Sequence, residues 1–251
     1  MSRTGAFVVT GAASGIGLAI TRRLLQEGHA VFGLGRKREK LLKAAEEFSG
    51  KPFVFLAADL SEPKAIHQAV LEIRDWLSEK RLPLLGLVNN AGVFDRIAFH
   101  LTSDAIWERH FHNNLLSAVR LTRELYPDLQ HGKPSSVLNI SSTLALRPIS
   151  HTAAYSAMKA AMVNWTHSVA LEWAAEGIRA NCICPGIVDT PIHDFHSYGE
   201  KDEARVRANN EQPLGRMGVP QDIAEAAWYF LGPQSSWTTG TVINVDGGIL
   251  L

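Results

Sequence analysis

Short apolar runs alternate with amphipathic stretches along the whole chain. Runs of about five apolar residues between turn signals are typical of strands buried on both faces, and apolar residues three or four apart are typical of helices. The expected strands cover 6–9, 30–34, 53–57, 84–88, 136–140, 180–184 and 242–245. The expected helices cover about 15–27, 37–48, 63–79 and 154–176, and a further long helix precedes residue 136.

This alternation of strand and helix predicts right-handed crossovers and a parallel sheet with helices on both faces. We therefore expect a single doubly wound α/β domain over residues 1–251, with seven strands and no internal linker or repeat. The polar stretch 190–214, which includes the charged run 200–207, interrupts the pattern. Long insertions of this kind favour a substrate lid, with inert surface decoration as the alternative.

Charge and composition exclude several classes of partner. The 251 residues include 25 basic and 25 acidic side chains, so the net charge of zero gives no electrostatic case for nucleic acid or an anionic membrane. No apolar run approaches the roughly 20 residues that a membrane span requires, and no signal peptide precedes the first strand. The expected location is the cytoplasm.

The two cysteines, Cys182 and Cys184, alternate within one predicted strand. We interpret them as reduced and partly buried, which fits a reducing compartment. The alternative is a redox or metal pair, but no Cys or His partner stands at ligand spacing. None of the ten histidines has metal-ligand spacing either, so no metal site is expected.

A glycine-rich turn joins the first expected strand to the first expected helix. Gly11, Gly15 and Gly17 allow a tight turn and a close approach of the backbone to a pyrophosphate, with Ser14 and Ile16 between them. The N-terminus of the following helix offers free N–H groups and a partial positive charge. A purely structural turn is the alternative, but this position in the chain favours dinucleotide binding.

The expected choice between NADP and NAD depends on Arg36. The second strand ends at Gly35, where an acidic residue would bind the ribose 2′-hydroxyl of NAD, and Arg36 follows. A guanidinium in this place favours the 2′-phosphate of NADP. The alternatives are that Arg36 begins a solvated helix with Lys37 and Arg38, and that the cofactor is NAD(H).

Tyr155 and Lys159 are the candidate chemical pair. They stand four residues apart in a predicted helix and so share one face of it. A phenol has a free pKa of about 10, and a nearby cation favours the phenolate. Tyr155 then exchanges a proton with a carbonyl or alcohol oxygen. The spacing alone is weak evidence for chemistry, because it is more typical of a pair on the surface of a helix.

Together these segments resemble the short-chain dehydrogenase/reductase family, in particular its 3-oxoacyl-carrier-protein reductases. The resemblance covers essentially the whole chain and implies a Rossmann fold. It rests on these motifs: Thr10-Gly11-x-x-x-Gly15-Ile16-Gly17, Asp59-Leu60, Asn89-Asn90-Ala91-Gly92, Asn114, Ser142, Tyr155-x-x-x-Lys159, Pro185-Gly186, Arg216-Met217-Gly218-x-Pro220 and Asp246-Gly247-Gly248.

The resemblance implies further contacts with the cofactor. Asp59 and Leu60 are expected to flank the adenine. A group after the fourth strand is expected beside the adenine ribose: Asn90, Ala91 and Gly92. A second group is expected to line the nicotinamide: Pro185, Gly186, Ile187, Val188 and Thr190.

The resemblance also assigns the catalytic roles. Ser142 is expected to orient the substrate oxygen, with the adjacent Ser141 as the alternative. Tyr155 is expected to be the acid in reduction and the base in oxidation. Lys159 is expected to bind the nicotinamide ribose and to lower the pKa of Tyr155. Asn114 is expected to hold a water that extends the proton relay, with Asn113 as its competitor for that role.

The implied activity is NADP(H)-dependent interconversion of a ketone and a secondary alcohol, with a small-molecule carbonyl or alcohol as substrate and a homotetramer as the assembly. The alternatives are an NAD-preferring polyol or sugar dehydrogenase, a catalytically silent dinucleotide-binding regulator, and an epimerase or dehydratase. The expected pocket walls are Val93, Phe94, Leu144, Ile149, His151, Ile187, Ile192, His193, Phe195 and His196.

Overall fold

Seven strands pair side by side, all parallel, in a computed structural model that describes residues 4–193 and 201–251, the side chains of 201 and 202 excepted. The strand order is β3-β2-β1-β4-β5-β6-β7, which is the order of a doubly wound fold. The strands are β1 (Ala6–Thr10), β2 (Ala30–Gly35), β3 (Phe53–Ala57), β4 (Leu84–Asn89), β5 (Ser135–Ile140), β6 (Ile178–Pro185) and β7 (Val242–Val245).

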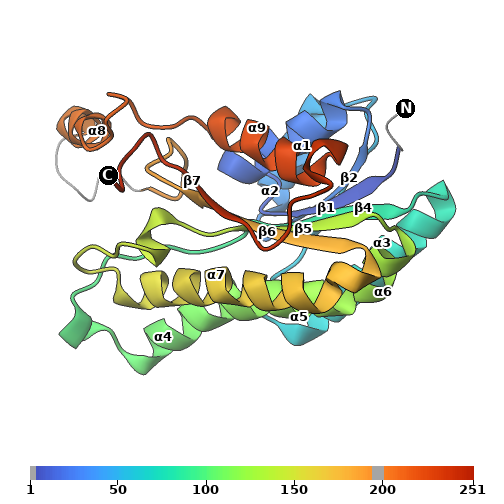
Figure 1. The fold of residues 1–251 in the computed structure, drawn as a ribbon, viewed down its shortest axis with the longest axis horizontal. Coiled ribbons are helices and arrows are strands. Elements are labelled where there is room, and N and C mark those ends of the chain that lie inside the picture. The colour runs from blue at the N-terminus through green and yellow to red at the C-terminus, as the bar shows by residue number, and fades with distance from the viewer. Residues whose placement is uncertain (1–3, 194–200) are drawn as a thin grey trace.

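The helices cover both faces of this sheet (Figure 1). One layer contains α1 (Gly15–Gln26), α2 (Arg38–Glu47) and α9 (Pro220–Leu231). The other contains α3 (Pro63–Lys80), α4 (Asp104–Phe111), α5 (Ser117–Glu124), α6 (Tyr126–His131) and α7 (Ala153–Trp173). The polar helix α8 (Lys201–Asn210) lies beyond the C-terminal end of the sheet.

Each helical layer closes over its own hydrophobic core. Alternate residues of β1 point to opposite faces of the sheet. Val8 accordingly packs in the cluster that includes Leu121 and Val169, whereas Val9 packs in the cluster that includes Ile20 and Phe230. All four of these cluster partners are at most 7% exposed. Burial on both faces explains why the strands are continuous apolar runs rather than alternating ones.

The strand order reverses direction between β1 and β4, and this is where an open α/β sheet offers its ligand crevice. Thr10 links the ends of the two strands. Its hydroxyl accepts hydrogen bonds from the backbone N–H groups of Asn90 and Ala91, both at 2.9 Å, and donates one to the carbonyl of Val88. The side chain of Asn90 donates to the carbonyl of Thr10 at 2.9 Å. The glycine-rich turn and the Asn90 segment therefore face each other.

The structure differs from the sequence-based expectation in its helices. The long helix expected before residue 136 is three helices, with a π-helical turn over His112–Leu116 between α4 and α5. Pro127 stands in the first turn of α6, where a missing N–H costs nothing, and so helps to separate α6 from α5. Two helices, α8 and α9, were not expected at all. The other helix bounds move by at most three residues.

Membrane spans, metal clusters and cysteines can be examined in the part of the chain that the structure describes. Within residues 4–193 and 201–251, no helix combines the length and apolar character that a membrane span needs, and no cluster of three or more His, Cys, Asp or Glu could hold a metal ion. Cys182 and Cys184 are free thiols. Both are fully buried rather than partly buried, because β6 is covered on its two faces.

Candidate active site

A cavity of about 290 Å³ lies over the carboxyl ends of the strands at the switch point. Its lining unites segments that the sequence singled out separately. The expected residues that line it are Gly11, Ser14, Gly15, Ile16, Arg36, Leu60, Asn90, Ala91, Gly92 and Thr190. Two expected residues, Gly17 and Asp59, do not line it.

The glycine-rich turn needs its glycines for two separate reasons. Gly11 and Gly15 have φ values of 69° and 52°, in the left-handed region that favours glycine. Gly17 is buried, and a Cβ there would overlap the carbonyl oxygen of Gly11. It therefore allows helix α1 to approach β1 closely, which explains its absence from the cavity wall. The first turn of α1 has no acidic side chain and Ser14 does not cap it, so its N–H groups remain suited to an anion.

The far end of this cavity is basic. Arg36, Lys37 and Lys40 contribute to its lining, and none of the described lining residues is acidic. Asp59 lies nearby with its carboxylate bound to the backbone N–H and the hydroxyl of Ser61, at 3.0 and 2.8 Å. Burial raises the pKa of Asp59, but the Ser61 hydrogen bonds and the charge of Arg36 lower it more, so the net pKa lies below its usual value.

Sequence reasoning missed Lys40. The signal was present, because Lys40 stands three residues after Lys37 and four after Arg36, the spacing at which side chains share a helical face. All three cations are exposed, so their charges stay in water until an anion binds.

A second, smaller cavity of about 90 Å³ adjoins the first. Ile16, Asn90, Gly92 and Thr190 line both cavities, so the two form one continuous crevice. The expected catalytic and nicotinamide-lining residues found in the smaller cavity are Ser142, Tyr155, Lys159, Pro185, Gly186, Val188 and Thr190. Ile187, also expected there, does not line it.

The two adjacent serines have different partners. Ser141 is 4% exposed and its hydroxyl donates to the carbonyl oxygen of Lys159 at 2.9 Å, which ties the end of β5 to α7. Ser142 accepts a hydrogen bond from the backbone N–H of Leu144 at 3.1 Å and forms another with the phenol of Tyr155. Of the two, Ser142 is therefore the hydroxyl placed beside the candidate acid.

The phenol of Tyr155 is deeply buried. Burial raises its pKa to about 12, against the opposing effect of the hydrogen bond with Ser142. The expected lowering by Lys159 is not found in this structure. Burial is the largest influence on this pKa, and the ammonium group of Lys159 instead donates to the carbonyl oxygen of Ile140 at 2.8 Å. Tyr155 is thus fully protonated at neutral pH and able to donate a proton.

Lys159 is 3% exposed. Burial lowers the pKa of its ammonium group to about 8, so the group remains mostly charged at neutral pH. No carboxylate of the described residues pairs with it, and the carbonyl of Ile140 is its one recorded hydrogen-bond acceptor there. A buried cation with so few partners beside a cavity is typical of a functional group.

Asn114 lies in the π-helical turn and is fully buried, whereas Asn113 donates to the carbonyl of Arg109 and lines the larger cavity. The amide of Asn114 holds the backbone of Val93. Gly92 lies between Asn114 and Lys159, since a Cβ on Gly92 would be 2.7 Å from Asn114 Oδ1 and 3.9 Å from Lys159 Nζ. Asn114 is thus near the ammonium group, and the water-holding role expected for it stays a prediction.

The walls of the smaller cavity agree in part with expectation. Four of the expected wall residues line it, namely Phe94, Leu144, Ile192 and His193. Val93, Ile149 and His151 do not. Ile149 is instead 50% exposed. Phe195 and His196, expected in the lid, lie outside the described residues.

The chain is similar to known proteins over nearly its whole length. Residues 11–250 match the family model described as "Enoyl-(Acyl carrier protein) reductase". The chain is 31% identical to the 3-oxoacyl-(acyl-carrier-protein) reductase FabG of Thermotoga maritima over 249 residues, which covers 97% of each protein.

Two solved structures share the fold. A variant of actinorhodin polyketide ketoreductase with NADPH superposes with a TM-score of 0.90 and 32% identity, over 99% of each chain. The ligand-free aldohexose dehydrogenase of Thermoplasma acidophilum has a TM-score of 0.88 and 27% identity, over 99% of this chain and 94% of the other. The chain therefore belongs to the short-chain dehydrogenase/reductase family, whose named members here are oxidoreductases that act on CH–OH and C=O groups.

Proposed function

We propose that this protein interconverts a ketone and a secondary alcohol with NADP(H). One observation carries the proposal: Ser142, Tyr155 and Lys159 line one small cavity that continues into the glycine-rich cavity over the switch point. A dinucleotide site and a proton donor beside it are the two parts that carbonyl reduction requires.

The residues of the larger cavity fit a dinucleotide phosphate. The uncapped start of α1 and the turn at Gly11 suit the pyrophosphate. Arg36, Lys37 and Lys40 suit the additional 2′-phosphate of NADP. When bound, the nicotinamide group supplies or accepts the hydride.

The protein's own groups act on the oxygen of the substrate. Ser142 and Tyr155 have adjacent hydroxyls that can donate hydrogen bonds to a carbonyl oxygen, where negative charge develops during reduction. Tyr155, protonated at neutral pH, delivers the proton. The ammonium group of Lys159, which stays mostly charged at neutral pH, binds ribose hydroxyls of the cofactor.

The walls of the smaller cavity favour a carbonyl with apolar substituents. Phe94, Leu144, Val188 and Ile192 line it. This lining suits the β-ketoacyl class, to which the names of the FabG and polyketide relatives point, better than a polyhydroxylated sugar. A polyol or sugar dehydrogenase is the second candidate, favoured by the likeness to the aldohexose dehydrogenase. A silent regulator is disfavoured by the complete set of catalytic candidates.

Changing Arg36 to Glu is expected to lower the preference for NADPH over NADH. The reason is the loss of a charge-assisted contact, which contributes about 1.5–3 kcal/mol, or roughly ten- to a hundredfold in affinity. The measurement is the ratio of kcat/KM for the two cofactors. Lys43→Glu makes the same charge change at an exposed position of α2 outside the cavity and serves as the matched control. An unchanged ratio in Arg36→Glu would contradict the assignment.

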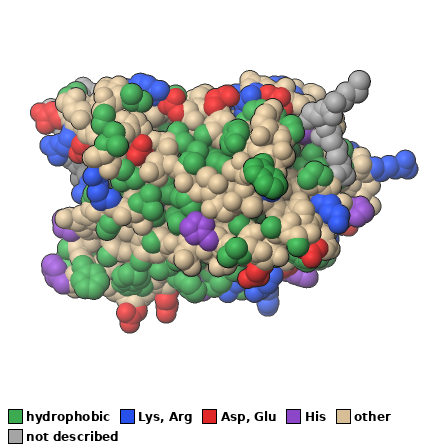
Figure 2. All heavy atoms as spheres, viewed as in Figure 1, with side chains coloured by type: hydrophobic (Ala, Val, Ile, Leu, Met, Phe, Trp, Pro, Cys, Tyr) green, Lys and Arg blue, Asp and Glu red, His purple; other side chains and the backbone are tan. Residues whose placement is uncertain are grey.

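We propose a homotetramer as the assembly. Helix α7 contains only two charged residues, the buried Lys159 and Glu172, while Ala157 and Leu171 are exposed, Leu171 at 83%. In the view of Figure 2, charged side chains lie mainly at the margins, and apolar and uncharged atoms occupy the middle of the face that α7 crosses. Light scattering should give four times the 27.5 kDa mass of one chain, and a monomer would refute the assembly.

The compartment proposed is the cytoplasm. The support is that Cys182 and Cys184 are free, fully buried thiols, which fits a reducing environment.

A further inference from the structure

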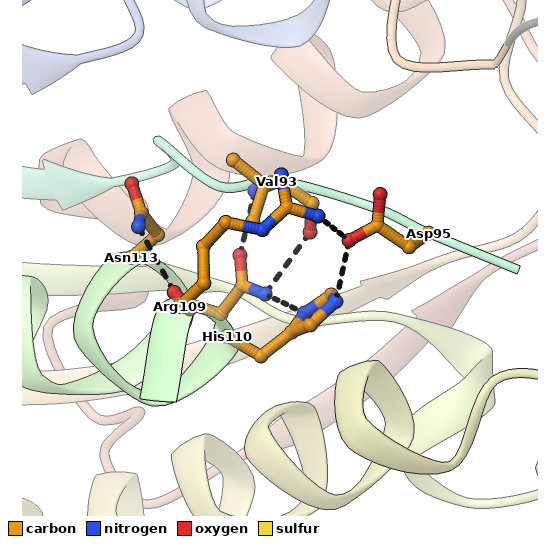
Figure 3. A network of polar contacts seen from close by, with 6 residues as sticks. Val93, Asp95, Arg109, His110 and Asn113 are labelled. Carbon is orange, nitrogen blue, oxygen red and sulfur yellow. Dashed lines mark hydrogen bonds and ion pairs between the residues drawn. The ribbon is translucent and has the colours of Figure 1, made fainter. Parts of the chain in front are cut away.

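His110 belongs to a network of polar contacts that also includes Asp95 and Arg109 (Figure 3). It is the buried residue of α4, 1% exposed, and it stands four residues before Asn114 on the same helical face. Its ring nitrogens have two different partners. Nδ1 is 2.7 Å from Asn114 Nδ2, and Nε2 is 2.9 Å from Asp95 Oδ2.

The contacts of Asn114 determine where the proton of His110 resides. The backbone N–H of Val93 donates to Asn114 Oδ1 at 2.7 Å, which fixes the orientation of the amide. Asn114 Nδ2 is then a donor with two hydrogens, of which one binds the carbonyl of Val93 at 3.0 Å. The other points at His110 Nδ1, which must accept it. The imidazole is therefore the neutral form with its proton on Nε2, donated to Asp95.

Asp95 closes the network on the outer side. It accepts the proton of His110 Nε2 and also binds the guanidinium of Arg109. Burial lowers the pKa of His110, and this effect outweighs the opposing charge of Asp95. In the neutral imidazole both ring nitrogens of His110 therefore have partners, Asn114 at Nδ1 and Asp95 at Nε2. Figure 3 shows Asp95 between His110 and Arg109.

The inner end of the network reaches the reaction site. Asn114 pairs with both backbone groups of Val93, in the manner of a neighbouring strand, and so fixes the segment between Gly92 and Phe94. The ring of Phe94 contacts that of Tyr155 edge to face, with centroids 4.9 Å apart. The His110 ring itself lies 6.2 Å from the same phenol.

We infer that His110 is a positioning residue for the proposed reaction: it fixes the amide of Asn114, which holds the Val93 backbone and, through Phe94, the position of Tyr155. The inference rests on the proposed function. It implies that His110 has little influence on NADPH binding and a large one on the chemical step, because small misplacements of reacting groups are costly.

The test compares three variants with the wild type. In His110→Phe the ring remains but the acceptor for Asn114 Nδ2 is lost, so kcat should fall about tenfold or more while KM for NADPH stays unchanged. His110→Gln offers one acceptor and one donor from its amide and should recover most of kcat. His112→Phe is the matched control, since His112 contacts the carbonyl of Glu108 outside this network. Equal kcat in His110→Phe and wild type would overturn the inference.

A second readout does not depend on turnover. Amide hydrogen exchange at Val93 should be about tenfold or more faster in His110→Phe than in wild type, and nearly normal in His110→Gln, because the Asn114 amide then holds Val93 less firmly. Unchanged exchange would overturn the inference even if the protein had no carbonyl reductase activity. Conversely, a reductase whose turnover depends on Tyr155 but not on His110 would leave the proposed function intact and refute the positioning role alone.

Discussion

Replacing Tyr155 with Phe is expected to lower carbonyl turnover by roughly 100- to 10,000-fold, the usual contribution of a positioned acid or base. The variant keeps the aromatic ring and its contact with Phe94 but loses the hydroxyl that is hydrogen-bonded to Ser142. The phenol carries the proton at neutral pH, so the substitution removes the proposed proton donor. Steady-state rates with NADPH, together with its Kd by fluorescence titration, check this expectation, and the Kd should be nearly unchanged.

Tyr229→Phe is the matched control for this experiment. Tyr229 is 45% exposed in α9 and does not line either cavity, so its hydroxyl can be removed without effect on turnover. If Tyr155→Phe retained most of its activity, Tyr155 would not be the acid and the reaction assigned to this site would be wrong.

Replacing Lys159 with Met is expected to reduce turnover at least about a hundredfold and yet to stabilise the fold. The wild-type ammonium group is buried, and its pKa falls from 10.5 to about 8. Such a shift corresponds to about 3 kcal/mol of unfavourable burial at neutral pH. Losing the hydrogen bond to the Ile140 carbonyl offsets about 1–2 kcal/mol of that, so a net gain of about 1–2 kcal/mol in unfolding free energy remains.

The stabilisation expected for Lys159→Met depends on pH, because the charge of Lys159 depends on pH. Below pH 8 the lysine is charged in both states, so the wild type carries the full penalty. Between pH 8 and 10.5 the unfolded chain binds more protons than the folded one, and wild-type stability rises with pH. The advantage of Lys159→Met should therefore shrink across this window.

Urea unfolding at pH 7 and at pH 9.5 measures the advantage of Lys159→Met. Lys43→Met, at an exposed position of α2, should show neither the stabilisation nor its pH dependence. A destabilised Lys159→Met at pH 7 would show that the hydrogen bond to Ile140 outweighs the cost of burying the charge.

The sheet could be predicted almost residue by residue because its physical signal is local. A strand buried on both faces must be largely apolar, so the runs in Ala6–Thr10 and Leu84–Asn89 stand out in the sequence. The parallel direction of the strands followed from the strand–helix–strand crossovers. The glycine-rich turn could also be predicted, because the positive φ values of Gly11 and Gly15 favour glycine at these positions.

The helices were harder because their ends depend on tertiary contacts. The π-helical turn at Asn114 has no sequence signature of its own, and it splits a stretch that reads as one helix. Helix α9 had usable signals that were not used. Pro220 is in its first turn, and Asp222 accepts a hydrogen bond from the backbone N–H of Val219 at 2.8 Å.

The site was predicted by residue type but not by environment. The sequence favoured Ser142 over Ser141 through resemblance, and the structure gives a physical reason, because the hydroxyl of Ser141 is bound to the Lys159 carbonyl. The pKa of Tyr155 was expected to fall and instead rises, since burial is a property of the whole fold. The role of His110 could not be predicted for the same reason. Its partners Asn114 and Asp95 come close to it only because the π-helical turn and the loop after β4 place them there.

Transfer of deuterium tests the central claim most directly. NADPH deuterated at C4 is incubated with the protein and a panel of ketones, β-ketoesters, acyl thioesters and keto-sugars, and the products are analysed by mass spectrometry and NMR. The account predicts a secondary alcohol with deuterium on its carbinol carbon for one class of carbonyl, formed by wild type and not by Tyr155→Phe. Tight NADPH binding with no labelled alcohol from any class would contradict it and favour a silent dinucleotide-binding protein.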